Sequence, residues 1–365
     1  MTDPVWAIGL MSGTSGDGID AALLRTDGER IVETGPGIGE AYDPAFRARL
    51  KSAYGQWEPP AGLERELTER HAALVLRLVA QAGMRPGEIG VVGFHGQTIL
   101  HEPEKHRTRQ IGDGALLAAL TGIAVVNDFR SADMAAGGEG APLAPVYHRA
   151  LAAGLEKPVA MLNIGGVSNV TFIGDGDTLI AFDTGPGNAL IDDWALRHTG
   201  EPVDRDGALA KSGRVDEAAV ARFLENPFFK RAAPKSLDRD AFKAFSLGAL
   251  SAADGAATLT AITAASIAAG IEHLPQAPKR WLVCGGGRHN PVLMAALRAR
   301  LGAVDPIEAI GWDGDLIEAQ AFALMAVRSM HGLPISFPGT TGVKAPTTGG
   351  RLHRPGKRPP ALKMA

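Results

Sequence analysis

The sequence predicts an α/β protein with two lobes and mixed sheets. Three observations lead to this prediction. Short apolar runs of strand length alternate with longer segments of helical periodicity. The chain has 365 residues, which is more than one compact domain usually holds. A strand, a glycine-rich turn and a second strand occur at residues 8–20 and again at residues 160–171, so we expect two related lobes that each open with a hairpin.

The first lobe is expected to cover residues 1–132. Its apolar runs predict strands over residues 5–10, 19–24, 89–94 and 123–126. Its helical periodicity predicts helices over residues 63–82 and 114–120.

The second lobe is expected to cover residues 133–350. The predicted strands are residues 159–162, 170–173, 179–182 and 280–283, and the predicted helices are residues 189–198, 291–301 and 316–330. Residues 252–270 are apolar but include Asp254, so we expect a buried helix rather than a membrane span. The basic, proline-containing tail at residues 351–365 is expected to be poorly ordered or to pack back on the first lobe as an extended arm.

The composition excludes several classes of protein. Hydrophobic residues make up 45% and charged residues 21%, a balance that rules out disorder over most of the chain. The net charge of −3 gives no basic field for nucleic acid or a membrane surface, and neither is an expected partner. The single cysteine, Cys284, cannot form an internal disulfide or a multi-thiolate metal site. The N-terminus lacks a signal-peptide pattern, so we expect a cytoplasmic protein.

The densest polar cluster is Met11-Ser12-Gly13-Thr14-Ser15-Gly16-Asp17-Gly18-Ile19-Asp20. Its glycines would let backbone N–H groups surround phosphate oxygens, and its hydroxyls add donors. Its two carboxylates could hold Mg²⁺ through water. No Gly-Lys-Ser/Thr is present, so this is not a Walker A loop. The residues favour a phosphate-binding turn, with a decorated hairpin turn as the alternative.

Two further glycine turns follow predicted strands. Phe182-Asp183-Thr184-Gly185-Pro186-Gly187-Asn188 places a carboxylate at a strand end. There it could act as a general base or metal anchor, or cap the helix that begins at Ala189. The N–H groups that follow could contact phosphate. Gly285-Gly286-Gly287 could let an adenosine lie against the backbone, and a tight turn explains the same residues.

Polar residues also follow the other predicted strands. His95 reads as a hydrogen-bonded structural histidine. Arg130 could bind a carboxylate bidentately or form a surface ion pair. Residues 137–142 could be a hinge or a substrate loop, and residues 163–169 could press against a ligand or serve only the fold.

Together and in this order, these segments resemble the anhydro-N-acetylmuramic acid kinase family. The resemblance runs from Ile8 to about Gly350. The matching segments are GLMSGTSGDGID, FHGQT, QIGDG, NDFR, GGEGAPLAP, LNIGGVSN, FDTGPGN, KS..R, CGGGRHN and DLIEAQAFA.

The resemblance implies the two-lobed, ribonuclease H-like fold of sugar kinases, actin and Hsp70, with an active-site cleft between the lobes. It implies an enzyme that uses ATP and Mg²⁺ to open the 1,6-anhydro ring of anhydro-N-acetylmuramic acid and to phosphorylate the freed O6. The product would be N-acetylmuramic acid 6-phosphate, in the recycling of cell-wall sugars. A cytoplasmic homodimer with a small amino-sugar substrate is expected.

The resemblance also implies roles for individual residues. Asp183 would be the catalytic base. The ATP phosphate loop would comprise Gly13, Thr14, Ser15, Gly16, Asp17, Gly18, Ile19 and Asp20, with Mg²⁺ held by Asp17 and Asp20. Further nucleotide contacts would come from Gly185, Gly187, Gly285, Gly286 and Gly287. The sugar would be contacted by Thr98, Arg130, Asp183 and Glu318.

Four positions, in three segments, depart from the family pattern. Gly16 replaces a usual leucine and is expected to loosen the phosphate loop slightly. Glu139 replaces a usual glutamine and could weaken binding of a substrate carboxylate. Leu237-Asp238 replaces a usual Thr-Gly, so that segment could be a structural connection. Two other functions stay open: a kinase of the same superfamily that acts on another sugar hydroxyl, and an ATP-binding regulator without turnover.

Overall fold

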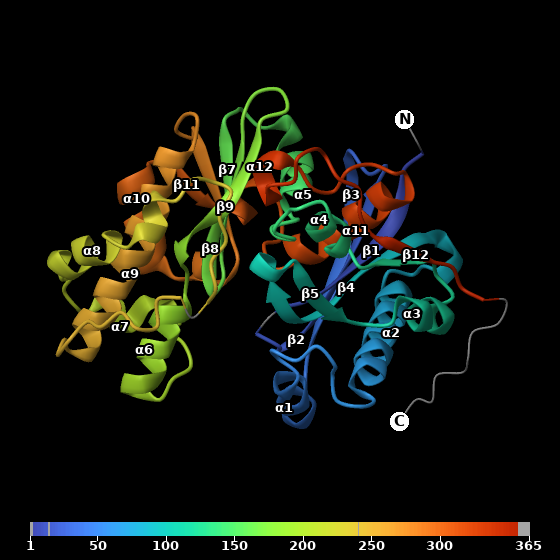
Figure 1. The fold of residues 1–365 in the computed structure, drawn as a ribbon, viewed down its shortest axis with the longest axis horizontal. Helices are drawn as coiled ribbons and strands as arrows, with labels where there is room; N and C mark the ends of the chain where they lie inside the picture. Colours follow the sequence, from blue (N-terminus) through green and yellow to red (C-terminus); the bar gives the residue numbers. More distant parts are fainter. Residues whose placement is uncertain (1–2, 14, 240, 357–365) are drawn as a thin grey trace. The chain divides into compact units, whose positions relative to one another are not determined.

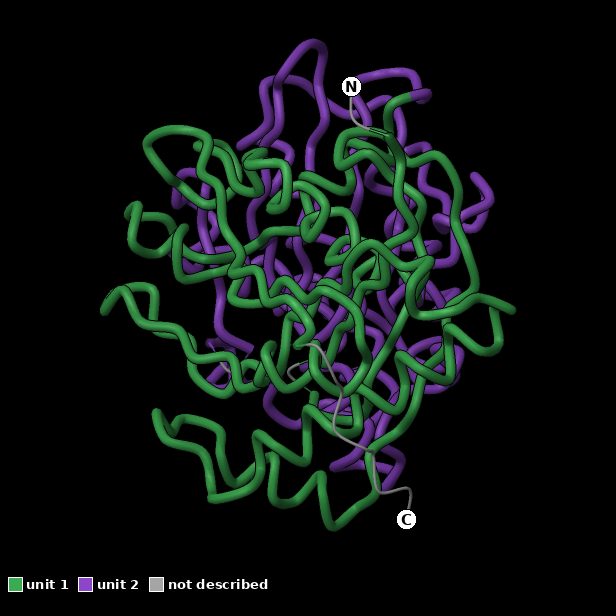
Figure 2. The backbone as a smooth tube through the Cα atoms, turned by 90° about the vertical axis from the view of Figure 1, so that its right-hand side faces the viewer, with its two compact units in different colours: residues 1–153, 316–365 green, residues 154–315 purple. Residues whose placement is uncertain are grey.

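The computed structural model describes residues 3–13, 15–239 and 241–356. The chain forms two compact units (Figures 1 and 2), of which unit 1 is residues 1–153 with 316–365 and unit 2 is residues 154–315. These bounds differ from the expected lobes. Helix α5 (Pro145–Leu151) and helix α11 (Ile317–Met330) pack against each other, and α11 packs on the sheet of unit 1. A boundary drawn along the sequence cannot show that a late helix returns to an early sheet.

Unit 1 is built on a mixed sheet. Its described strands are β1 (Val5–Ser12), β2 (Gly18–Thr26), β3 (Ile31–Ala41), β4 (Ile89–Glu102), β5 (Arg107–Ile111), β6 (Val125–Asn127) and β12 (Arg351–His353). The order is β12-β6-β4-β1-β2-β3, and β5 pairs with β4. Strands β6, β4 and β1 are parallel, whereas β1, β2 and β3 form an antiparallel meander. Strand β12 pairs with β6, so this part of the tail packs on unit 1 as an extended arm, and residues 357–365 lie outside the described part.

The described helices of unit 1 are α1 (Pro44–Ser52), α2 (Leu63–Gln81), α3 (Gly114–Thr121), α4 (Ser131–Ala135), α5 (Pro145–Leu151), α11 (Ile317–Met330) and α12 (Pro338–Thr341). Helix α11 packs on β1, β2 and β4. Gly9 of β1 and Gly93 of β4 are partners in the sheet, and the backbone of α11 packs directly on both. A Cβ at Gly9 would lie 1.7 Å from the Ala319 carbonyl oxygen, and one at Gly93 would lie 2.0 Å from that of Phe322. The helix backbone can therefore approach the sheet only because both side chains are absent.

Unit 2 has a second mixed sheet with the same plan. Its described strands are β7 (Val159–Ile164), β8 (Val167–Ile173), β9 (Leu179–Pro186), β10 (Arg280–Cys284) and β11 (Val304–Pro306). The order β11-β10-β7-β8-β9 has the same strand directions as β6-β4-β1-β2-β3 of unit 1. The prediction of an α/β protein with mixed sheets and two related halves is confirmed, and each half opens with the predicted hairpin.

The described helices of unit 2 are α6 (Ala189–Thr199), α7 (Ala208–Lys211), α8 (Glu217–Leu224), α9 (Ala252–Ala269) and α10 (Pro291–Leu301). Helix α9 packs against the other four helices and β9, so the predicted buried helix is confirmed. Within the described residues, one helical stretch, Ala252–His273, is long and apolar enough to cross a membrane, and 78% of its apolar window is buried inside the protein.

Candidate active site

The polar cluster at residues 11–20 forms the turn between β1 and β2. Gly16 has a φ of 61°, and its N–H donates to the Gly13 carbonyl at 3.0 Å. The Ser15 hydroxyl donates to the exposed Asp17 carboxylate at 2.8 Å. Asp20 is also exposed, whereas the Ile19 side chain is buried, so Ile19 can offer a ligand only its backbone. Thr14 lies outside the described residues. The turn therefore presents hydroxyl and carboxylate groups at its surface.

Gln97 of β4 fixes the base of this turn. Its Oε1 accepts from the Ser12 hydroxyl at 2.6 Å, and its Nε2 donates to the Gly13 carbonyl at 2.9 Å. The Tyr42 hydroxyl lies 3.0 Å from the Ser12 hydroxyl. Ser12 and Gln97 are buried, so these bonds are shielded from water and hold the turn in one arrangement.

Gly16 was expected to loosen the turn. In this chain, the hydroxyl of Tyr54 occupies the adjacent space, 2.5 Å from where a Cβ would lie. That hydroxyl accepts a hydrogen bond from Gln97 Nε2 at 3.3 Å. The left-handed backbone at Gly16 suits glycine best. The Tyr54 hydroxyl packs against the turn in the space that a leucine side chain at residue 16 would occupy.

Arg130 and His95 form a hydrogen-bonded pair in unit 1, in which His95 is buried and Arg130 is half-buried. Arg130 Nε donates to His95 Nε2 at 3.0 Å. Because an arginine can only donate, His95 Nε2 carries no proton, and His95 Nδ1 donates to the Gly96 carbonyl at 2.9 Å. Burial lowers the pKa of His95 well below its ordinary value, and the Arg130 charge lowers it further. His95 is therefore a neutral, hydrogen-bonded structural histidine, as predicted.

A second bond ties Arg130 to the glycine loop that follows α4. Its Nη1 donates to the Gly140 carbonyl at 2.7 Å, and the Gly140 N–H donates to the buried Asp133 carboxylate at 2.6 Å. Burial lowers the pKa of Arg130 to about 10, while the charges of Glu318 and Asp133 act to raise it. Nη2 donates to no other residue in the described ranges, so it is the guanidinium nitrogen that can reach a ligand without breaking these bonds.

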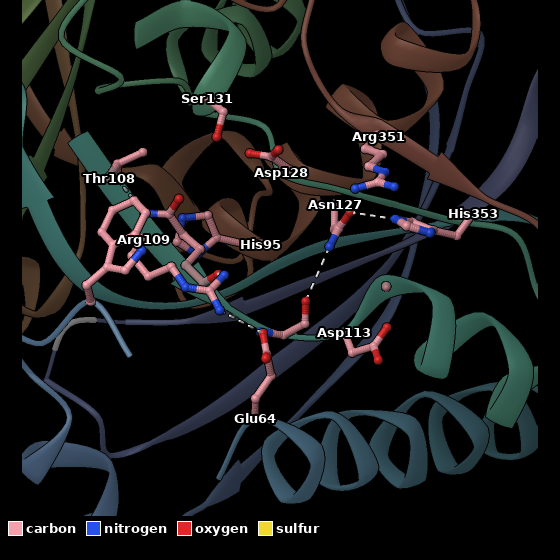
Figure 3. Close-up of a pocket in the computed structure, with 14 residues that line it drawn as sticks. Glu64, His95, Thr108, Arg109, Asp113, Asn127, Asp128, Ser131, Arg351 and His353 are labelled. Atoms are coloured by element: carbon pink, nitrogen blue, oxygen red, sulfur yellow. Dashed lines mark hydrogen bonds and ion pairs between the residues drawn. The ribbon is translucent and has the colours of Figure 1, made fainter. Parts of the chain in front are cut away.

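A polar cavity of about 440 Å³ lies in unit 1 (Figure 3). Its lining residues are Trp57, Glu64, His95, Thr108, Arg109, Gln110, Gly112, Asp113, Gly114, Asn127, Asp128, Ser131, Arg351 and His353. Two of them reach expected contact residues: Gln110 Nε2 donates to the Thr98 hydroxyl at 3.2 Å, and His95 accepts from Arg130. Asp128, at the end of β6, has a φ of 56°, a conformation that is uncommon outside glycine. The volume is in the range of small-ligand pockets.

Three glycine-containing segments of unit 2 contact one another at one end of its sheet: residues 163–169, 185–188 and 285–287. The Asn188 N–H donates to the Gly165 carbonyl at 2.7 Å, and the Gly187 N–H donates to that of Gly166 at 2.9 Å. A Cβ at Gly285 would lie 2.3 Å from Asn163 Oδ1, and one at Gly287 would lie 2.4 Å from Ile164 Cγ2. Tight packing against Asn163 and Ile164 therefore explains why residues 285 and 287 are glycine.

Gly286 differs from its two neighbours. The nearest atom to a Cβ built there would be Asn188 Nδ2 at 3.6 Å, which is ordinary contact distance. Its backbone is therefore the part of the triple glycine that a nucleotide could approach closely. Gly185 has a φ of 153° and lies against Ser266.

Asp183 lies in β9, half-buried, beside the segment that follows residue 234. Its N–H donates to the Lys235 carbonyl at 2.9 Å, and its Oδ2 accepts from the Leu237 N–H at 2.7 Å. The N-cap of α6 is Asn188, so the reading of Asp183 as the cap of that helix is wrong. The carboxylate is instead oriented by a backbone donor.

The described residues contain no group of three or more histidine, cysteine, aspartate or glutamate side chains that could hold a metal ion. Asp17 and Asp20 supply exposed oxygen donors, the type that Mg²⁺ prefers, and Mg²⁺ commonly binds through one or two carboxylates, water and substrate phosphates. The residues therefore fit a magnesium ion brought with a nucleotide.

Comparison with known proteins identifies the family. The model of the anhydro-N-acetylmuramic acid kinase family matches residues 5–354. The chain belongs to this family. The anhydro-N-acetylmuramic acid kinase of Rhodospirillum rubrum is 59% identical over 355 residues, which cover 95% of this chain and 93% of the relative. That of Paramagnetospirillum magneticum is 57% identical over 353 residues, which cover 96% of this chain and 99% of the relative.

Membership in the anhydro-N-acetylmuramic acid kinase family confirms the resemblance. The residues matched to the family's sites fall in both units. Unit 1 holds the β1–β2 turn, Thr98, Arg130 and Glu318, and unit 2 holds Asp183 with the glycines at 185, 187 and 285–287. Glu318 is exposed in the first turn of α11, and its charge acts on Arg130.

Several supporting residues were not predicted. Gln97 lies in the segment FHGQT and Asp133 lies shortly after NDFR, but neither was assigned a role from the sequence. Each forms a hydrogen bond with a residue that is far away along the chain, so the sequence does not reveal the pair. Gln97 donates to the Gly13 carbonyl, and Asp133 accepts from the Thr341 hydroxyl at 2.5 Å. A polar residue next to a predicted buried strand was the available signal, because a buried polar side chain needs a partner.

Proposed function

We propose that this protein is an ATP-dependent kinase that opens 1,6-anhydro-N-acetylmuramic acid by hydrolysis and phosphorylates O6. The product is N-acetylmuramic acid 6-phosphate, and the reaction belongs to the recycling of cell-wall sugars. The family match over residues 5–354 is the observation that carries this proposal. The bond from the Leu237 N–H to Asp183 supports it further, because it stabilises the ionised form that a general base must have.

Asp183 takes a proton from a water molecule. The water oxygen forms a bond to the anomeric carbon of the sugar, and the bond between that carbon and O6 breaks. O6 gains negative charge and forms a bond to the γ-phosphorus of ATP, while the bond to the leaving ADP breaks. Ring opening thus supplies the nucleophile that an ordinary sugar kinase makes by deprotonating a hydroxyl.

The nucleotide is assigned to the glycine turns. The β1–β2 turn would bind phosphate oxygens through its N–H groups and the Ser15 hydroxyl, and Gly286 would lie against the adenosine. Asp17 and Asp20 would hold Mg²⁺ through water. When bound, Mg²⁺ would neutralise charge on the phosphates during transfer.

The sugar is assigned to the expected contact residues of unit 1, of which Thr98 and Arg130 lie next to the cavity lining. The hydrogen bonds from Gln110 to Thr98 and from Arg130 to His95 connect the lining to the expected contact residues. Arg130 Nη2 would hold the lactyl carboxylate and orient the ring for attack. In this proposal the general base is Asp183 of unit 2. A cytoplasmic homodimer is part of the proposal.

The decisive experiment compares the wild-type protein with Asp183→Asn. Loss of a general base lowers turnover by about 10²–10⁴-fold, and we expect the variant to fall in that range while it stays folded. Asp177→Asn is the matched control, since Asp177 is exposed in the turn before β9 and should keep full activity. Near-normal turnover by folded Asp183→Asn would remove Asp183 from this role.

Mass spectrometry of the product formed in ¹⁸O-labelled water tests the chemistry itself. One label at the anomeric position together with one phosphate is expected. A phosphate without the label, on a panel of anhydro and reducing sugars, would indicate a kinase that acts on an intact hydroxyl. ATP binding without ADP release on any sugar of the panel would indicate a regulator.

A further inference from the structure

We propose that Lys235 is a positioning residue for Asp183, because it pins residues 235–237 along the edge of β9 so that the Leu237 N–H meets the Asp183 carboxylate. The inference rests on the proposed function, in which Asp183 takes the proton. It gives a role to Lys235, a buried cation that the reaction scheme does not use.

Two backbone groups of residues 235–237 form hydrogen bonds with Asp183. Strand β9 is the last strand of its sheet, so its outer edge needs partners. The Asp183 N–H donates to the Lys235 carbonyl at 2.9 Å, and two residues later the Leu237 N–H donates to Asp183 Oδ2 at 2.7 Å. The same short segment therefore fixes both the backbone and the carboxylate of the proposed base.

Lys235 anchors this segment from inside the protein. Its side chain is 4% exposed, and Nζ donates to the Phe228 carbonyl at 3.1 Å and the Phe229 carbonyl at 3.4 Å. These carbonyls belong to the short helix η5 (Pro227–Lys230). Nζ also lies 4.6 Å from the centre of the Phe228 ring, where a cation is attracted to the ring face. No carboxylate in the described residues forms an ion pair with Lys235, so carbonyl oxygens and the ring take the place of a counter-ion.

The groups around the ammonium allow it to stay charged near neutral pH. Burial and, to a smaller extent, the charge of Arg231 together lower the pKa of Lys235 to about 8. His273 Nε2 lies 2.7 Å from the Phe229 carbonyl and 3.1 Å from Nζ. In the tautomer whose Nε2 carries the proton, Nε2 donates to the Phe229 carbonyl, and His273 Nε2 and Lys235 Nζ then share this acceptor.

The hydrogen bond from the Leu237 N–H to Asp183 is compatible with the departure from the family pattern at Leu237-Asp238. Leu237-Asp238 stands where a Thr-Gly is usual, which suggested a structural connection. The donor to Asp183 is the peptide N–H of residue 237, which every residue except proline carries. The change of side chain therefore leaves the donor in place.

Two substitutions separate the anchor from the donor. Lys235→Met keeps the apolar stem and removes the ammonium. It leaves neither carbonyl without a donor, because Phe228 still accepts from the Arg231 N–H and Phe229 from His273. Leu237→Pro removes the N–H that bonds to Asp183, and Leu237→Ala keeps it as the matched control.

Loss of the hydrogen bond from the Leu237 N–H disfavours the ionised form of the Asp183 carboxylate. In Lys235→Met and Leu237→Pro we expect the acid limb of the kcat profile to move about one pH unit upward, with KM for ATP within twofold of wild type. Leu237→Ala and Lys235→Arg should keep the wild-type limb. A purely structural role would lower the melting temperature in Lys235→Met and leave the acid limb unchanged, and that result would overturn the proposal.

Two NMR measurements need no turnover. The ¹³C titration midpoint of the Asp183 carboxyl, assigned by comparison with Asp183→Asn, should rise by about one pH unit in Lys235→Met. In the wild-type protein, the Leu237 amide should exchange slowly with solvent, and at least tenfold faster in Asp183→Ala. Exchange of the wild-type amide at the rate of an unstructured peptide would overturn the proposal even if both variants failed to fold.

These measurements separate the two hypotheses. If the NMR results are as expected but the wild-type protein does not turn over anhydro-N-acetylmuramic acid, the proposed function fails and the positioning contact stands. If turnover is normal but the titration midpoint of Asp183 is the same in wild type and Lys235→Met, the positioning role fails alone.

Discussion

Arg130 directs two of its three guanidinium nitrogens into the protein, toward His95 and Gly140, and Nη2 is the nitrogen proposed to hold a substrate carboxylate. A hydrogen bond to a charged group contributes about 1.5–3 kcal/mol, so Arg130→Ala should raise KM for the sugar about 10–100-fold. KM for ATP should stay within twofold. Steady-state kinetics with each substrate varied in turn measures both values.

Lysine cannot replace this arginine. Its single ammonium cannot reach His95, Gly140 and a ligand in the same planar arrangement, so Arg130→Lys should remain impaired. Arg77→Ala is the control, because Arg77 is half-exposed in an ion pair with Glu40. A larger effect on KM for ATP than for the sugar would contradict the assignment of Arg130 to the substrate carboxylate.

At the scale of the element, the close packing of α11 on the sheet of unit 1 predicts the effect of adding a side chain at Gly9. A Cβ at Gly9 would lie 1.7 Å from the Ala319 carbonyl, directly after Glu318. Gly9→Ala should lower the free energy of unfolding by about 1–3 kcal/mol or more, because the helix must move away from the strand. It should also raise KM for the sugar, since Glu318 shifts with the helix. Urea denaturation and kinetics check both effects.

Gly87→Ala is the matched control for this element. Nothing lies within 4 Å of a Cβ at Gly87, so its stability and kinetics should equal those of the wild type. Equal stability of Gly9→Ala and the wild type would mean that α11 does not rest on this strand.

The elements also show what the sequence could predict. The two hairpins and the strand that carries Asp183 followed from local patterns of apolar residues and glycines. Strand β3 (Ile31–Ala41) was missed because this edge strand is mostly exposed and carries glycine, proline and glutamate. The contact of Leu237 with Asp183 joins residues 54 positions apart through a backbone N–H, which no residue type reveals.

At the scale of the whole molecule, three buried histidines lie in unit 1: His71, His95 and His148. Burial lowers the pKa of His71 and of His148 to about 4, and it lowers the pKa of His95 well below its ordinary value. All three are neutral in the folded protein. The unfolded chain binds protons at these positions once the pH falls below about 6.5, so acid favours unfolding.

Stability should therefore fall as the pH drops from about 6.5 toward 4, by about 1.4 kcal/mol per pH unit for each fully protonated histidine of the unfolded chain. Urea denaturation at pH 7.5 and pH 5 measures this loss, and hydrogen exchange should show unit 1 opening before unit 2 at pH 5. His71→Leu should reduce the slope by the share of one histidine, because the ring is wholly buried and its Nε2 has no partner in the described structure. His289→Gln, at an exposed position of unit 2, should leave the slope unchanged. A free energy of unfolding that is constant between pH 7.5 and pH 5 would mean that these histidines are already protonated inside the fold, contrary to the donor arrangement at His95.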